Sequence, residues 1–144
     1  MRLETGWYSK DEYIVVKPLH NKCRQSLVMG VISRGRGRWD VYVGVFSSYT
    51  TYKSMNYSNV WVNPTSTNKS PSMKVITLAL EALNEIEQEI HYNACGKRAF
   101  IYVDGLDERR LRVYTKILTK RCGYKISTAK SEHDINLPML YKRV

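Results

Sequence analysis

Three arginines, Arg34, Arg36 and Arg38, alternate with glycines in one short stretch of the chain. A guanidinium carries several N–H donors in a planar fork that matches the oxygens of a phosphate. Trp39 and a later tyrosine-rich stretch add ring faces on which bases could stack. The stretch therefore predicts phosphate contacts at a hairpin tip. The simpler interpretation is a solvated turn in which glycine supplies the positive φ angles.

A second basic group falls on a helix expected near residues 107–121. Its members recur at helical spacing, on the face opposite the apolar stripe of that helix. They are Arg109, Arg112, Lys116 and Lys120. The segment Leu106 to Val144 holds ten Lys or Arg and four Asp or Glu, a net charge of +6 in 39 residues. This excess predicts an anionic partner such as nucleic acid.

Three carboxylates, Glu12, Asp40 and Asp104, are candidates for a base that accepts the proton of an amine. Asp104 precedes Gly105, and this pair is more simply interpreted as a turn. The three histidines are far apart, and the three cysteines form no CxxC pair. The sequence therefore predicts no metal site and no disulfide framework.

One long amphipathic helix is expected near residues 71–92, opened by Ser70-Pro71 and ended before Gly96. Its apolar stripe consists of Ile76, Leu80, Leu83, Ile86 and Ile90. The apolar run 99–103 that follows predicts a central strand buried on both faces.

Other strands are expected at 12–19, 26–33, 38–46 and 59–62, and near 124–126 and 137–143. The pair 26–33 and 38–46 reads as a hairpin. Taken together, the elements predict one α/β domain over residues 1–144. Its sheet is expected to be mixed and mostly antiparallel, with two main helices.

This order of elements resembles the C-terminal two-thirds of GNAT-type N-acyltransferases, over roughly residues 28–144. In that family a strand, a polar loop and a helix are followed by a strand, a second helix and a terminal β-hairpin. The local text is similar as well: Asp107, Val113-Tyr114 and Gly123-Tyr124-Lys125-Ile126 stand in comparable places.

The resemblance implies an acyl-coenzyme A-dependent N-acyltransferase that uses acetyl-coenzyme A or another acyl-coenzyme A. An amine of an anionic partner, nucleic acid or protein, would attack the thioester between the strands 59–62 and 100–103. Tyr114 would then reprotonate the thiolate, and Asp104 is the candidate base. The implied cofactor-binding residues are Val60, Trp61, Val62, Asn63, Thr67, Lys69, Ser70 and Ser72. The simpler interpretation of Tyr114 is a structural one, a tyrosine packed in the core.

A ribonuclease-H-like fold is the alternative. It also opens with antiparallel strands, a helix and a parallel strand, and Ser72 to Leu83 reads much like its first helix. Two-metal chemistry requires several carboxylates. The expected helix start offers Ser72 and Lys74 where an acid would be needed, so this alternative favours a metal-free binding protein.

Composition places the chain among globular proteins. Its 144 residues are 43% hydrophobic, and 23 Lys or Arg against 13 Asp or Glu give a net charge of +10. No apolar span approaches membrane length, and the first thirty residues contain no signal-peptide core. We therefore expect a cytoplasmic protein without a membrane partner. The competing function is a non-enzymatic nucleic-acid-binding module, as in phage or mobile-element accessory proteins.

Overall fold

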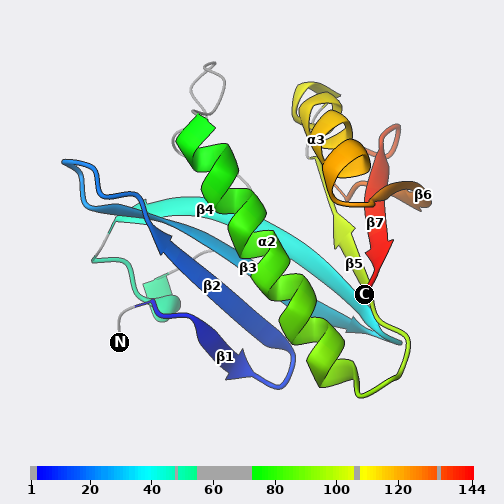
Figure 1. The fold of residues 1–144 in the computed structure, drawn as a ribbon, viewed down its shortest axis with the longest axis horizontal. Helices are drawn as coiled ribbons and strands as arrows, with labels where there is room; N and C mark the ends of the chain where they lie inside the picture. Colours follow the sequence, from blue (N-terminus) through cyan, green and yellow to red (C-terminus); the bar gives the residue numbers. More distant parts are fainter. Residues whose placement is uncertain (1–2, 48, 55–72, 106–107, 133) are drawn as a thin grey trace. The chain divides into compact units, whose positions relative to one another are not determined.

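A computed structural model describes residues 3–47, 49–54, 73–105, 108–132 and 134–144. Figure 1 shows its helices and strands. In chain order these are β1 (Gly6–Ser9), β2 (Glu12–Pro18), β3 (Gln25–Gly35), β4 (Arg38–Ser47), the 3-10 helix η1 (Tyr52–Ser54), α2 (Met73–Ala94), β5 (Phe100–Val103), α3 (Glu108–Arg121), β6 (Lys125–Lys130) and β7 (Pro138–Arg143).

The strands hydrogen-bond in the order β1-β2-β3-β4-β5-β7-β6. β1–β2, β2–β3, β5–β7 and β6–β7 are antiparallel pairs, whereas β4 and β5 are parallel. The parallel ladder joins Arg38–Val41 to Phe100–Val103. The predicted α/β class and the mixed, mostly antiparallel sheet are therefore confirmed.

The chain divides into two compact units. Unit 1 consists of Met1–Ile32 and Tyr42–Glu89, and unit 2 consists of Ser33–Val41 and Ile90–Val144. The strands β3 and β4 and the helix α2 each contribute residues to both units.

In unit 1, α2 packs against one face of the strands (Figure 1). Lys17 Nζ lies 2.7 Å from Glu85 Oε2, and Trp7 Nε1 donates a 2.8 Å hydrogen bond to Glu89 Oε1. Tyr13 is buried next to them, 5.1 Å from Trp7 between ring centroids. Burial raises the pKa of Tyr13 above its ordinary value of 10.0, and the charges of Glu89 and Glu85 raise it further.

The opposite face of unit 1 has a core of its own, built on Ile14, Val28 and Tyr42. Partly buried side chains pack around these three: Leu3, Tyr8, Val16, Ile32, Phe46 and Tyr52. Gly30 makes room for the ring of Tyr42, because a Cβ at position 30 would lie 2.2 Å from Tyr42 Cζ. Unit 1 therefore buries apolar side chains on both faces of its strands.

In unit 2, β5 lies between β4 and β7, and the strand 99–103 is central as predicted. The four residues of β5 alternate in exposure. Ile101 and Val103 are buried, whereas Phe100 and Tyr102 are half-buried. The helix α3 contributes the buried residues Leu111 and Leu118. The prediction that this strand is buried on both faces is therefore wrong, because Phe100 and Tyr102 point to a face that remains partly open.

The helix boundaries agree with the predictions. α2 ends at Ala94, and the next two residues, Cys95 and Gly96, both have positive φ, 51° and 84°. This left-handed pair ends the helix where glycine predicted it would end. The start signal Ser70-Pro71 and the expected strand 59–62 lie outside the described residues.

Candidate nucleic-acid interface

Nearly all of the net charge of the protein belongs to unit 2. Its sequence ranges hold fifteen Lys or Arg and six Asp or Glu, a net charge of +9. Unit 1 holds eight Lys or Arg and seven Asp or Glu, a net charge of +1. The two values add to the +10 of the whole chain. Such segregation concentrates the attraction for a polyanion on one part of the molecule.

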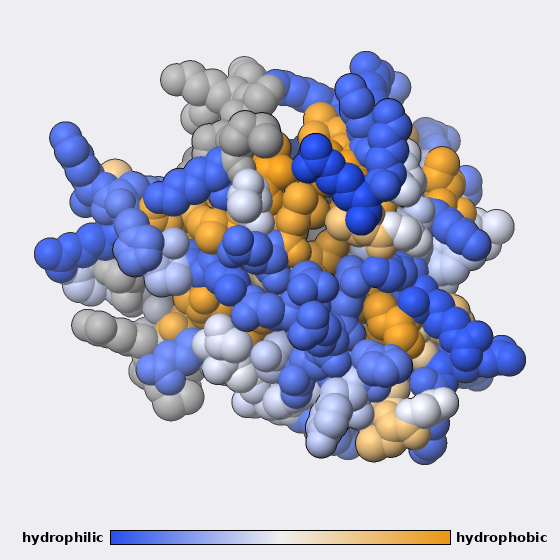
Figure 2. Space-filling model, viewed as in Figure 1, coloured by the Kyte–Doolittle hydropathy of each residue, from blue (hydrophilic) through white to orange (hydrophobic). Residues whose placement is uncertain are grey.

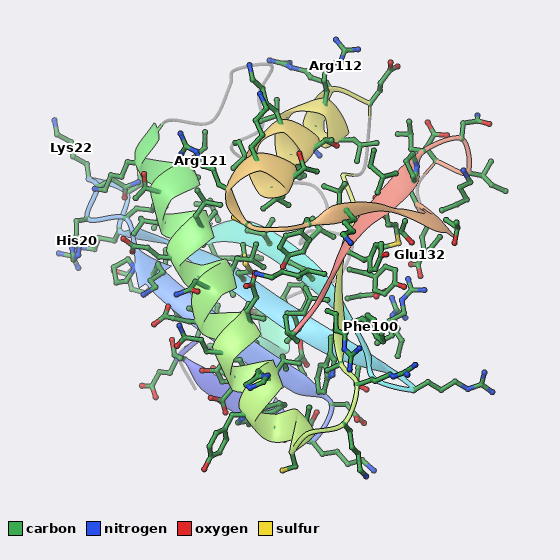
Figure 3. The ribbon with its side chains drawn as sticks, turned by 45° about the vertical axis from the view of Figure 1, so that its right-hand side comes forward. His20, Lys22, Phe100, Arg112, Arg121 and Glu132 are labelled. Atoms are coloured by element: carbon green, nitrogen blue, oxygen red, sulfur yellow. The ribbon has the colours of Figure 1, made fainter. Side chains whose placement is uncertain are left out.

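Within unit 2, the outer face of α3 carries a basic stripe: Arg109, Arg112, Lys116 and Lys120. All four side chains are exposed, and they recur every three or four residues opposite Leu111 and Leu118. At 1.5 Å per residue, the stripe is about 16 Å long. Figure 2 shows hydrophilic side chains in blue over this helix, and Figure 3 shows Arg112 extending outward from it.

Acidic side chains offset little of this stripe. Arg112 NH2 lies 3.3 Å from Glu108 Oε1, and both side chains are more than three-quarters exposed. An exposed pair of this kind is worth about 0.3–0.5 kcal/mol and exchanges readily for another anion. Arg112, Lys116 and Lys120 are therefore available to phosphates.

The hairpin tip differs from its prediction, because two of its three arginines are already paired. Arg34 Nε lies 3.0 Å from Asp40 Oδ2, and Arg38 Nε lies 2.8 Å from Asp40 Oδ1. Arg34 also approaches Glu132 at 3.5 Å. The side chain of Asp40 is only 7% exposed, so the two guanidiniums neutralise a buried carboxylate. The contact of Arg34 depends on how β3 lies against β4, whereas Arg38 and Asp40 are two residues apart on β4, a spacing that places both side chains on one face.

Arg36 is the tip arginine that remains available. It is exposed with a φ of 55°, and it makes no hydrogen bond or ion pair within the described part of the chain. Its neighbours Gly35 and Gly37 also have positive φ, 87° and 79°. The turn therefore uses glycine at its positive φ angles, as expected for a solvated turn. Of the three guanidiniums at the tip, that of Arg36 is the one left unpaired within the described part of the chain.

Glu12, the first candidate base, belongs to a buried network in unit 1. Its carboxylate accepts a 2.5 Å hydrogen bond from the hydroxyl of Tyr42 and another from that of Tyr52. Glu12 is 4% exposed and Tyr42 is 1% exposed. This nearly buried carboxylate joins the strands to η1, and the geometry supports a structural role.

Asp104, the third candidate base, closes a loop in unit 2. Its Oδ1 accepts a 2.7 Å hydrogen bond from Ser131 Oγ, and its Oδ2 accepts one of 3.2 Å from the backbone N–H of Glu132. Asp104 and Ser131 are each 6% exposed. The aspartate therefore ties the end of β5 to the turn after β6.

Residues proposed for acyl transfer are only partly described. Tyr114 is half-buried on α3, three residues after the buried Leu111 and four before the buried Leu118. The eight implied cofactor-binding residues, Val60, Trp61, Val62, Asn63, Thr67, Lys69, Ser70 and Ser72, lie outside the described residues. The two neighbours of β5 in the sheet are β4 and β7.

Sequence reasoning missed a set of rings on β5 and β7. In the β5–β7 register Tyr102 lies opposite Tyr141, and Phe100 lies opposite Arg143. Tyr102 and Tyr141 stack at 5.8 Å with 25° between their planes. The signal was the alternation of aromatic with aliphatic residues in Phe100-Ile101-Tyr102-Val103, which distinguishes a partly open face from a buried one.

The described residues hold neither a metal-binding cluster nor a helix that could span a membrane. They contain no group of three or more His, Cys, Asp or Glu that could hold a metal ion. None of the helices in the described ranges is long and apolar enough to cross a membrane. In comparisons with known proteins, the chain matches no family model, no curated protein and no solved structure.

Proposed function

We propose that this protein binds nucleic acid through unit 2, with the basic stripe of α3 as the main phosphate contact. The observation that carries the proposal is the segregation of charge, +9 in unit 2 against +1 in unit 1. A charge surplus that served solubility alone would have no reason to gather in one unit. Phosphate binding requires it to gather where the nucleic acid lies.

The proposal is tested by titrating labelled single-stranded and duplex oligonucleotides with the full chain and following fluorescence anisotropy. Affinity should fall with salt, the log–log slope being about 0.9 per phosphate contact on duplex and about 0.7 on a single strand. An uncharged peptide nucleic acid of the same sequence is the matched control and should not bind. Absence of binding at 50 mM salt, or a slope near zero, would overturn the proposal.

A second function, acyl transfer, is favoured by the order of elements. β4, α2, β5, α3 and the pair β6–β7 follow one another as in the layout that resembles the GNAT-type enzymes. In addition, β4 runs to Ser47, six residues beyond the four that pair with β5. This is compatible with strands that separate after a short parallel ladder.

In this second function an acyl-coenzyme A supplies the activated acyl group. The C–N bond would form as the C–S bond breaks, Tyr114 would give its hydroxyl proton to the departing thiolate, and the proton lost by the amine nitrogen would return through solvent to the tyrosinate. Asp104 is poorly suited as the base, because it is buried and already accepts two hydrogen bonds. Calorimetry with acetyl-coenzyme A tests this function directly. No heat of binding at millimolar concentration would exclude it, and the nucleic-acid proposal would stand unaffected.

A further inference from the structure

One face of the β5–β7 pair in unit 2 presents three rings, which we call the aromatic face: Phe100, Tyr102 and Tyr141. All three are half-buried, whereas Ile101, Val103 and Leu140 on the other face are buried. Residues directly opposite in an antiparallel pair lie on the same side of the sheet. Tyr102 and Tyr141 are opposite each other in the register, and Phe100 is two residues from Tyr102 on β5.

Cations surround these rings. Arg143 lies opposite Phe100, and Lys125 of the edge strand β6 lies opposite Tyr141. Both side chains are exposed, and neither makes a hydrogen bond or ion pair within the described part of the chain. A half-open aromatic surface bordered by cations matches a ligand with flat rings and a negative backbone.

Arg38 adds a third cation whose position is fixed. Its guanidinium lies 4.4 Å from the centroid of the Tyr102 ring, and its NH2 group donates to Met139 Sδ at 3.4 Å. Asp40 holds the group in place through two hydrogen bonds of 2.8 and 3.3 Å. These bonds raise the pKa of Arg38, against the burial that lowers it. The guanidinium therefore lies over the ring of Tyr102, so a base would stack on the guanidinium plane and not on the ring face that it covers.

We infer that the aromatic face is a stacking platform for the bases of single-stranded nucleic acid. This inference rests on the proposed nucleic-acid binding and names its form. Bases in a duplex are stacked on each other and present only their edges in the grooves. Unpaired bases offer whole ring faces, and these can be covered by Phe100, by Tyr141 and by the Arg38 guanidinium that lies over Tyr102.

The inference assigns different roles to two surfaces of unit 2. The stripe on α3 supplies phosphate contacts, so it sets the salt dependence of binding. The aromatic face supplies stacking, which depends little on salt, so it sets the preference for a single strand over a duplex. Base stacking is tolerant of sequence because every base has a ring face. We therefore expect little discrimination among sequences of equal length.

The first experiment uses the unmodified protein. An oligonucleotide containing 5-iodouridine is bound, irradiated and digested with protease, and the cross-linked peptides are identified by mass spectrometry. We expect cross-links at Phe100, Tyr102 or Tyr141. Cross-links confined to α3, or to residues of unit 1, would overturn the stacking platform even if the affinity for single strands is high.

The second experiment replaces Tyr102 and Tyr141 with leucine, separately and together. Leucine keeps apolar bulk on the strand but removes the ring face. One stacked base is worth about five- to 150-fold in affinity, so each variant should bind a single strand at least about fivefold more weakly. The salt slope should be unchanged, because no phosphate contact is lost.

Tyr49→Leu is the matched control. Tyr49 is 77% exposed and belongs to unit 1, so its replacement removes a more accessible ring outside the aromatic face. Its affinity should equal that of the unmodified protein. Duplex binding as tight as single-strand binding, or unchanged affinity in folded leucine variants, would overturn the inference and leave the proposed function standing. Loss of all binding by the unmodified protein would instead overturn the proposed function.

Discussion

Replacing Arg112, Lys116 and Lys120 with glutamine removes three exposed charges from the stripe on α3. Glutamine keeps the helix propensity of the positions, so the helix should persist. Within the described part of the chain, the ion pair that these replacements remove is the exposed one between Arg112 and Glu108. We therefore expect the free energy of unfolding to change by less than about 0.5 kcal/mol at each site.

The effect on binding follows from the number of phosphate contacts. If each of the three cations neutralises one phosphate of a duplex, the log–log salt slope should become shallower by about 2.7. The affinity of the unmodified protein should then fall about 40-fold more than that of the variant between 50 and 200 mM salt. Anisotropy titrations at four salt concentrations measure this difference directly.

Lys10, Lys22 and Arg24 provide the matched control. They are exposed, they belong to unit 1, and they make no hydrogen bond or ion pair through their side chains within the described part of the chain. Their triple glutamine variant has the same net charge as the α3 variant. If the log–log salt slope becomes shallower by the same amount in both variants, binding depends only on the total charge of the protein, and the reasoning about the stripe is refuted.

The remaining predictions concern stability. Tyr42→Phe removes one of two hydrogen bonds to the buried carboxylate of Glu12, so urea denaturation should show a loss of about 1.5–3 kcal/mol. The pKa of Tyr13 is higher in the folded state than its unfolded value of 10.0, so the contribution of Tyr13 to the free energy of unfolding is complete below pH 10.0. Above that pH the contribution declines, because the unfolded state releases the proton first. Tyr13→Phe should flatten this alkaline decline in the urea midpoint. Arg36→Ser should leave thermal stability unchanged, whereas Arg38→Ser should lower it, as calorimetry would show, because it leaves a buried carboxylate short of a partner.

Much of the fold could be predicted because each long element repeats one period. Of the predicted stripe of α2, Leu83, Ile86 and Ile90 are buried and Ile76 and Leu80 are half-buried. The short strand β1 could not be predicted in the same way. Its four residues alternate only twice, and the strand is defined by its pairing with β2. Periodicity needs length, so short edge strands are the elements it misses.

The candidate site was predicted unevenly for a related reason. Helix geometry fixes the direction of every side chain, so the face shared by Arg109, Arg112, Lys116 and Lys120 followed from spacing alone. The aromatic face depends on which residues of β5 and β7 lie opposite each other. That register depends on the hydrophobic patterns of both strands together and on tertiary packing, so it does not follow from either strand alone.

The arginines of the hairpin tip show why residue type and spacing do not suffice to assign a role. Arg34 and Arg38 differ from Arg36 only by position in an alternating run, yet both are bound to the buried Asp40. A charge already compensated inside the protein adds little to the field that attracts a polyanion. Arg38 contributes through its position over the ring of Tyr102, whereas Arg36 contributes its free charge. α3 holds six of the fifteen Lys or Arg of unit 2 and one of its six Asp or Glu, so its net charge of +5 is just over half of the +9 of that unit.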